Sequence, residues 1–306
     1  MGAYILKRLA LAVPSLIGVS ILVFSMSHLV PGDPVAIMLG ERATSADMAR
    51  LRAQLGLDRP LYIQYAEFVG RAVQGDLGTS IRTGRPVLQE IAEQFPSTLA
   101  LTLAAIVIAA ITGILAGTLS ATSSQQLIGG AVMVLVLLGI STPTFFSGLL
   151  LIIVFSLYLN WLPVATGTGL APLVLPSIAL AAPAAAVLAR ITRSSMLEEL
   201  RKDYVRTAYA KGLRLEGVVV RHVWKNAMIP IVTILGLQFG GLMAGAVIVE
   251  SVFARPGLGR YTVNAINARD FPQIQGTVLV VAVAYLLVNL LVDVLYAALD
   301  PRIKYQ

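Results

Sequence analysis

The sequence has no cysteine, two histidines and few charged residues. Without cysteine, the chain cannot hold a disulfide framework, a thiolate metal site or a cysteine nucleophile. Charged residues make up 13% of the 306 residues, whereas a soluble domain carries about 25%. Hydrophobic residues make up 57%. This composition excludes an ordinary soluble protein and predicts an all-α membrane protein with several spans.

A phosphate-binding loop of the form GxxxxGK[ST] is also absent from the sequence. The nearest string, residues 78–85, has different spacing and lacks the lysine that opens the helix in such loops. We therefore expect no nucleotide, no cofactor and no metal site in this chain. If the chain takes part in ATP-driven transport, the ATPase is another polypeptide.

Six apolar runs indicate the spans. The first, residues 9–30, has 22 uncharged residues. It is longer than the apolar region of a signal peptide, about 7–15 residues, and is long enough to cross a hydrocarbon core of about 30 Å. The other five runs are residues 99–119, 128–159, 172–189, 229–249 and 277–299.

Residues 31–97 are polar, with seven Lys/Arg and eight Asp/Glu. Ser45 is expected to cap a helix over residues 46–55, and Pro60 to open another. This segment predicts a small helical insertion outside the membrane, between the first two spans.

The run over residues 128–159 allows two interpretations. Ser141-Thr142-Pro143 interrupts it, so it forms either one long kinked helix or a tight hairpin of two. With one helix, both termini and residues 190–226 share a side that carries 13 of the 23 Lys/Arg. A hairpin would separate residues 190–226 from Lys7 and Arg8, against the positive-inside rule. We therefore predict six transmembrane helices with both termini in the cytoplasm. We attribute the excess of Lys and Arg over Asp and Glu to membrane orientation rather than to nucleic-acid binding.

The spans contain few polar groups. His28 and Asp293 are the ionisable residues within them, and for Asp293 a structural role is favoured over proton relay because it stands alone. Four neutral side chains are candidates for the lining of a pathway: Ser141, Thr142, Thr233 and Gln238. Their hydroxyl groups can equally bond backbone carbonyls.

Glycines recur at the spacing that lets two helices approach closely, at Gly113 with Gly117, Gly236 with Gly240 and Gly241 with Gly245. Such pairs serve packing within one chain or an interface between subunits. Pro143 and Pro183 interrupt apolar runs and are expected to kink their helices.

Residues 193–212 form the most informative stretch. Met196, Leu200 and Tyr204 recur at i, i+4 and i+8, which predicts an amphipathic helix. Gly212 is expected to end the helical segment. A basic amphipathic helix can also rest on anionic lipid headgroups.

At this stretch the chain resembles the permease subunits of ABC importers, in the branch for peptides, glutathione and nickel. Those permeases carry a cytoplasmic loop with Glu-Ala-Ala, three residues, Gly and a closing Ile-x-Leu-Pro. Here Arg206-Thr207-Ala208 occupies the Glu-Ala-Ala place, Gly212 keeps the spacing, and Met228-Ile229-Pro230 closes the element. The arginine and the longer gap to the proline resemble this branch's own form, Asp-Tyr-Val-Arg-Thr-Ala-x-Ala-Lys-Gly.

The resemblance covers the whole chain. Further matching segments are residues 31–34, 55–61, 75–80, 250–259 and 299–303. It implies a type I ABC importer fold in three parts: residues 1–30 with the first helix, residues 31–97 as the extracytoplasmic cap, and residues 98–306 with five helices. The third part includes a coupling loop at about residues 190–228, whose ATPase contacts would come from Asp203, Tyr204, Arg206, Thr207, Ala208, Lys211 and Gly212.

The resemblance also implies the partners. These are a second, similar permease, two ATP-binding subunits that hold ATP and Mg, an extracytoplasmic solute-binding protein and the lipid of the inner membrane. The expected solute is peptide-like, a di- or oligopeptide or glutathione.

Two alternatives to a peptide importer remain. One is nickel or a metal chelate. A direct nickel path is weakened because the chain lacks cysteine and because His28 and His222 fall towards opposite faces. The other is a secondary carrier, which is disfavoured by the near-absence of buried acids.

Overall fold

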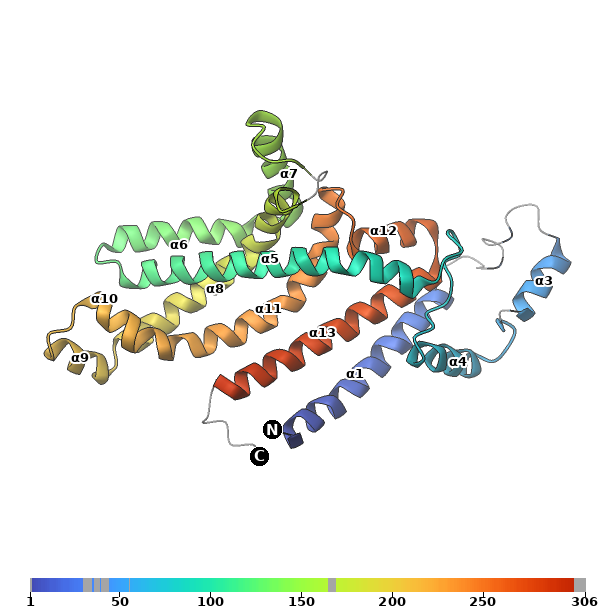
Figure 1. The fold of residues 1–306 in the computed structure, drawn as a ribbon, viewed down its shortest axis with the longest axis horizontal. Helices are drawn as coiled ribbons and strands as arrows, with labels where there is room; N and C mark the ends of the chain where they lie inside the picture. The colour runs from blue at the N-terminus through green and yellow to red at the C-terminus, as the bar shows by residue number, and fades with distance from the viewer. Residues whose placement is uncertain are drawn as a thin grey trace. The chain divides into compact units, whose positions relative to one another are not determined.

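The computed structural model describes residues 2–29, 44–54, 56–164 and 169–299, with Val35 and Leu39 (Figure 1). The described residues are almost entirely helical, and their one β-bridge joins Thr79 to Pro86. This confirms the all-α fold class. The chain divides into two compact units. Unit 1 comprises the residues up to Pro96 together with Arg260–Leu287, and unit 2 comprises Ser97–Gly259 with the residues from Val288.

Four helical segments of the described chain are long and apolar enough to cross a membrane. A bent pair of helices adds a fifth candidate, and α1 (Gly2–Leu29) contains a shorter apolar stretch, Ala10–Met26. The prediction of six spans is compatible with these segments and stays a prediction. The four long segments are α5 (Val87–Thr122), α8 (Ala171–Leu200), Leu215–Val252 and Phe271–Leu291 of α13 (Phe271–Leu299).

The apolar run over residues 128–159 is broken rather than kinked. It forms α6 (Gln126–Ser141), α7 (Thr144–Leu151) and the π-helix η1 (Ile152–Tyr158), with a bend of 105° at the break. Thr142 and Pro143 have ψ angles of 123° and 136°. Proline lacks an N–H and disfavours helical geometry at the residue before it, so both residues become extended. The interruption was predicted, but its sharpness was not.

Unit 2 has a core built from α5, α8 and α11 (Trp224–Val252). Gly113 shows how closely α5 and α8 approach, because a Cβ atom there would lie 2.7 Å from the carbonyl oxygen of Ala185. A Cβ at Gly117 would likewise meet Thr192 of α8. This pair of glycines therefore serves packing within the chain.

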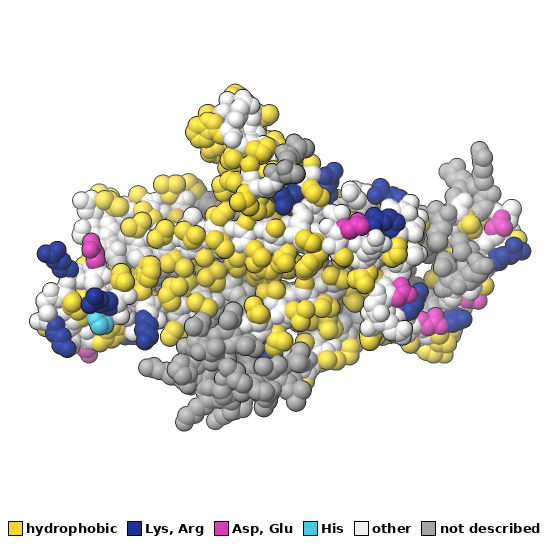
Figure 2. Space-filling model, in the orientation of Figure 1, with side chains coloured by type: hydrophobic (Ala, Val, Ile, Leu, Met, Phe, Trp, Pro, Cys, Tyr) yellow, Lys and Arg dark blue, Asp and Glu magenta, His cyan; other side chains and the backbone are white. Residues whose placement is uncertain are grey.

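The outer face of α5 is apolar and exposed. Leu103, Val107, Ile111 and Leu115 follow one another at four-residue spacing, and each is about half exposed. Figure 2 shows hydrophobic side chains over much of the visible face of α5 and α6. A helix that is apolar on its exposed face as well as its buried face is typical of a membrane environment.

Unit 1 contains α1, α3 (Ser45–Gln54) and α4 (Leu61–Val73). The hydroxyl groups of Ser20 in α1 and Tyr65 in α4 lie 2.7 Å apart, and Phe24 meets the Tyr65 ring edge-on. α4 begins after Pro60, as predicted. The expected cap at Ser45 is wrong by one residue, because the Thr44 hydroxyl accepts the N–H of Asp47 at 3.2 Å.

Residues 78–86 form a turn closed by the bridge between Thr79 and Pro86, and this turn contacts the start of α13 within unit 1. Asp270 precedes α13 and is fully buried, and its Oδ2 accepts hydrogen bonds from the Ser80 hydroxyl at 2.7 Å and from the Arg82 N–H at 3.1 Å. Gln273 donates to Oε2 of the buried Glu90 at 2.8 Å. Tyr261, in α12 (Leu258–Ala268), donates to the same oxygen, and burial followed by this bond raises the pKa of the phenol.

Several sequence predictions fall outside the described residues. They concern the segment 31–34, Leu55, the segment 300–303 and the side chains of Lys7, His28 and Asp293.

Candidate functional site

The segment predicted as a coupling loop begins inside a helix. α8 continues to Leu200, so residues 190–200 form its last turns. Lys202 is extended, with a ψ of 152°, and separates α8 from α9 (Asp203–Ala210). The spacing of Met196, Leu200 and Tyr204 predicted one continuous helix. This prediction is wrong, because α8 ends at Leu200 and α9 begins at Asp203.

α9 ends at Ala210 with Lys211 as its C-cap, and Gly212 follows directly as the residue that stops the helix, as predicted. The φ of Gly212 is +80°, a conformation that glycine adopts without the steric cost that a Cβ atom brings. The N–H of Gly212 donates to the carbonyl of Tyr209, and the N–H of Leu213 donates to the carbonyl of Ala208. This pair of bonds is a Schellman motif, which satisfies carbonyl groups at the end of the helix.

One face of α9 is anchored in a small hydrophobic core. Val205 and Ala208 are buried. They belong to a cluster that also contains Met196 of α8 and residues from α10 (Leu215–Val218), the π-helix η2 (Val219–Val223) and α11. This cluster is distinct from the core that the long helices share.

The opposite face of α9 is exposed. The side chains of Asp203 and Arg206 are 95% and 80% exposed and form an ion pair at 3.6 Å. Thr207, Lys211 and Gly212 are also exposed. A surface pair of this kind contributes about 0–1 kcal/mol to stability, so these groups are available for another contact. Of the predicted coupling residues, Ala208 is buried and Tyr204 is partly buried.

A buried carboxylate joins three helices at this site. Glu199, in the last turn of α8, is 8% exposed and accepts hydrogen bonds from Lys202 and from the hydroxyl of Tyr204. Asn226, in the first turn of α11, donates to the Tyr204 hydroxyl at 3.3 Å. The bond to Glu199 raises the pKa of Lys202. Burial, and then the bond to Glu199, raises the pKa of Tyr204.

Sequence reasoning missed Glu199 and Asn226. One signal was present, because Glu199 follows Met196 by three residues and therefore lies on the same, buried side of the helix. No comparable signal exists for Asn226, which is 22 residues from Tyr204 in the chain.

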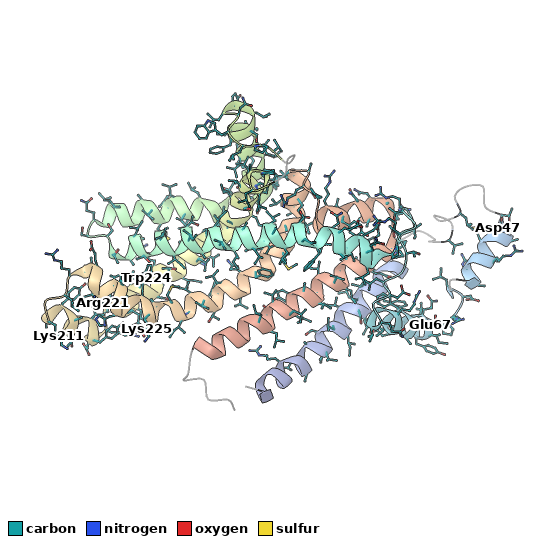
Figure 3. The ribbon with its side chains drawn as sticks, viewed as in Figure 1. Asp47, Glu67, Lys211, Arg221, Trp224 and Lys225 are labelled. Atoms are coloured by element: carbon teal, nitrogen blue, oxygen red, sulfur yellow. The ribbon has the colours of Figure 1, made fainter. Side chains whose placement is uncertain are left out.

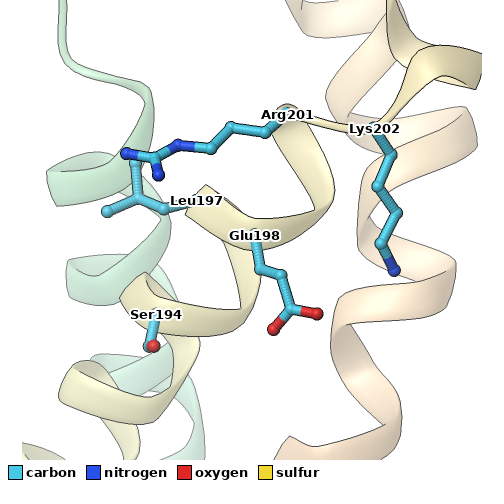
Figure 4. A pocket seen from close by; sticks show the side chains of 5 residues that line it. All are labelled: Ser194, Leu197, Glu198, Arg201 and Lys202. Carbon is cyan, nitrogen blue, oxygen red and sulfur yellow. The ribbon is translucent and has the colours of Figure 1, made fainter.

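Basic side chains surround α9. Figure 2 shows Lys and Arg gathered at the end of unit 2 that holds α9 and α10, and Figure 3 labels Lys211, Arg221 and Lys225 there. An open pocket of about 460 Å³ lies at the end of α8. In Figure 4, Arg201 and Lys202 extend to either side of Glu198. The five residues that line the pocket are Ser194, Leu197, Glu198, Arg201 and Lys202.

The predicted pathway residues lie on two helices. Ser141 and Thr142 are at the end of α6, and Thr233 and Gln238 are on α11. The three hydroxyl groups bond the carbonyls four residues earlier, at 3.3, 2.7 and 3.2 Å. Such bonds are the local alternative considered for these residues, and a role in lining a pathway stays a prediction. In the part of the chain that the structure describes, no group of three or more His, Asp or Glu could hold a metal ion.

Comparison with known families gives two matches. Residues 113–305 match the family described as the binding-protein-dependent transport system inner membrane component. Residues 1–102 match the model for the N-terminal part of such membrane components.

Curated relatives match the chain over almost its whole length. The glutathione transport system permease protein GsiC of Escherichia coli strain K12 is 46% identical over 303 residues, which are 99% of each chain. The protein of the same name from Salmonella choleraesuis strain SC-B67 is 45% identical over the same length.

Solved structures support the same fold. Two inward-facing crystal forms of the MetNI methionine ABC transporter match with TM-scores of 0.56 and 0.59. The identities are 15% and 17%, and the matches cover 70% and 69% of this chain and 97% of each matched chain. At this identity the likeness concerns the fold alone.

Proposed function

The chain belongs to the inner-membrane components of binding-protein-dependent transport systems, and on this premise we propose that it translocates glutathione or a related peptide as one permease of an ATP-driven importer. It is a multi-pass permease subunit of an ABC importer for peptide-like solutes. The observation that carries the choice of solute is the 46% identity to a glutathione permease over 99% of both chains.

In this proposal α9 is the contact for an ATP-binding subunit in the cytoplasm. Its buried face holds it on the ends of α8 and α11. Its exposed face offers Asp203, Arg206, Thr207 and Lys211 to a partner. Opposite charges side by side on this face suit a polar protein surface, where charge complementarity provides specificity.

The rest of the complex follows from the family. We propose a second, non-identical permease, two ATPase chains that bind ATP and Mg, and an external protein that delivers the solute. Neither ATP nor metal is assigned to this chain. Both termini and α9 lie in the cytoplasm in this arrangement, which the excess of Lys/Arg on that side supports.

The test of the solute is uptake by the assembled complex in proteoliposomes. Radiolabelled glutathione, a dipeptide and nickel are offered separately with the binding protein, with ATP inside or omitted. We expect ATP-dependent uptake of glutathione or the dipeptide. Nickel accumulation without either would support the metal importer instead, and uptake that persists without ATP would contradict an importer of this class.

The second permease has its own test. Purification in mild detergent through a tag on this chain is expected to recover another permease together with ATPase chains. A homodimer of this chain that transports solute with the ATPases would contradict the proposed heteromeric pathway.

A further inference from the structure

The carboxylate of Glu199 links α8, α9 and α11 through one tyrosine. Tyr204 donates its hydroxyl hydrogen to Oε2 of Glu199, and the same hydroxyl accepts the side-chain N–H of Asn226. The other carboxylate oxygen accepts from Lys202, in the connection between α8 and α9. Glu199, Tyr204 and Asn226 are called the latch below.

The connection between α8 and α9 does not fix their angle by itself. It consists of Arg201 and Lys202, and no side chain caps the start of α9. α9 has eight residues, fewer than the roughly 12–15 at which an isolated helix becomes even marginally stable in water. Its position therefore depends on contacts with the rest of unit 2.

The hydrophobic contacts of α9 are not directional. Val205 and Ala208 contribute its buried side chains, and apolar burial holds a helix down without fixing its rotation. A hydrogen bond to an ionised acceptor is directional and about twice as strong as one between neutral groups. The Tyr204–Glu199 bond is of this kind and is partly buried, so it sets the orientation of α9.

The latch also connects α9 to both helices of the membrane core. α8 and α11 share that core through residues such as Leu188 and Ile231. We propose that the latch makes the ends of α8, α9 and α11 move as one body, so that movement of α9 by the ATPase reaches both long helices together. Glu199, Tyr204 and Asn226 are thus positioning residues. This inference rests on the proposed function, in which α9 is the ATPase contact.

The main test variants are Tyr204→Phe, which removes the hydroxyl and keeps the ring, and Glu199→Gln, which removes the charge. Tyr158→Phe and Glu216→Gln are matched controls, because Tyr158 is an exposed tyrosine of η1 and Glu216 is an exposed glutamate of α10. The measured quantity is ATP hydrolysed per glutathione or dipeptide transported in proteoliposomes with the binding protein. We expect this ratio to rise about tenfold in the test variants and to stay unchanged in the controls.

A second measurement does not depend on the solute. The chain has no cysteine, so Ala210→Cys with Arg221→Cys places two spin labels uniquely, one at the end of α9 and one in η2. We expect one narrow distance distribution in the assembled complex, and a broad one when Tyr204→Phe is added. If the proposed function is wrong, the complex without latch mutations will transport neither glutathione nor the dipeptide. The distance between the two spin labels will still show whether the latch holds α9 in place.

An unchanged ATP ratio in Tyr204→Phe, or an unchanged label distance, would overturn the proposal. Loss of the ATPase chains from the purified Tyr204→Phe complex would also overturn it, because the hydroxyl would then act in docking rather than in positioning. If Glu199→Gln does not assemble, Tyr204→Phe and Asn226→Ala carry the test, since both remove uncharged groups.

Discussion

The hydroxyl of Thr98 donates a hydrogen bond to the carboxylate of Glu250 over 2.6 Å. Glu250, at the end of α11, is fully buried, and its other oxygen accepts the N–H of Gly259 at 2.8 Å. Thr98 in turn accepts the N–H of Leu258 at 2.8 Å. The two side chains therefore satisfy backbone donors at the start of α12, which has no intrahelical acceptor for them.

Glu250→Ala is expected to lower the free energy of unfolding by about 3 kcal/mol, because it leaves buried donors on Thr98 and Gly259 without an acceptor. Glu250→Gln keeps acceptor oxygen at the site and should cost less. The measurement is thermal or denaturant unfolding of the chain in detergent, with Glu216→Ala at an exposed position as the control. Equal stability of Glu250→Ala and the control would contradict this role.

Two glycines in long helices should respond oppositely to alanine. A Cβ atom at Gly113 would lie 2.7 Å from both the Ala185 carbonyl oxygen and the Leu188 Cβ, whereas one at Gly241 has nothing within 4 Å. Gly113→Ala should therefore destabilise the chain by about 1–3 kcal/mol through overpacking. Gly241→Ala should be neutral or slightly stabilising, since alanine favours a helix. The same unfolding assay checks both, and equal effects would show that α5 and α8 do not approach this closely.

Gly212 should be sensitive to backbone conformation rather than to size. A Cβ atom there would have nothing within 4 Å, but the φ of +80° is unfavourable for residues other than glycine, by about 1–2 kcal/mol. We expect Gly212→Val to uncouple ATP hydrolysis from transport, and Gly212→Asn to retain more coupling, because asparagine tolerates this region. Gly217→Ala in α10 is the control. A valine variant as well coupled as the asparagine variant would contradict this explanation.

The features predicted from the sequence follow local rules. Pro60 before α4, Pro143 at the broken helix and Gly212 after α9 each act through their own backbone, so the residue type is enough. The break at Lys202 was missed because Met196, Leu200 and Tyr204 keep helical spacing across it. An apolar pattern reports which side chains are buried, and α8 and α9 bury theirs in one cluster.

The buried carboxylates could not be predicted in the same way. Glu250 accepts a hydrogen bond from Thr98, which is 152 residues away in the sequence, and Asp270 accepts one from Ser80, which is 190 residues away. From sequence alone, a charged residue is expected to be exposed unless its buried hydrogen-bond partner is known. A single sequence does not identify a partner that lies so far away in the chain. The candidate site shows the same limit, since Asp203 and Arg206 were identified by resemblance while Glu199 was overlooked.

The latch should be insensitive to pH across the physiological range. The pKa of Lys202 is raised by its bond to Glu199, and the pKa of Tyr204 is raised by burial and by the same carboxylate. A group whose pKa is raised in the folded state contributes fully to folded-state stability below its unfolded-state pKa, which is about 10 for both groups. This contribution is lost as the pH rises through the folded-state pKa. We therefore expect a constant label distance between Ala210→Cys and Arg221→Cys from about pH 6 to 9. A transition in that interval would show that another group controls α9.

The topology can be tested with single cysteines, because the chain has none of its own. Ser45, Ser124, Leu170 and Ser194 are exposed sites in four different segments. Six spans with cytoplasmic termini place Ser45 and Leu170 outside, and Ser124 and Ser194 inside. A membrane-impermeant maleimide on sealed cells should therefore label Ser45→Cys and Leu170→Cys, and label the other two variants only after permeabilisation.

The pair Ser124 and Leu170 decides what the broken helix does. The bend of 105° between Leu127–Ser141 and Thr144–Tyr158 fits either a broken span or a segment that enters the membrane and returns. A broken span leaves the two sites on opposite sides, and a returning segment leaves them on the same side. The positive-inside rule favours the span, since it keeps residues 190–226 with Lys7 and Arg8. With Ser45 outside, a returning segment would keep both Ser124→Cys and Leu170→Cys unlabelled until permeabilisation. It would also expose Ser194→Cys to labelling from outside, which would contradict six spans.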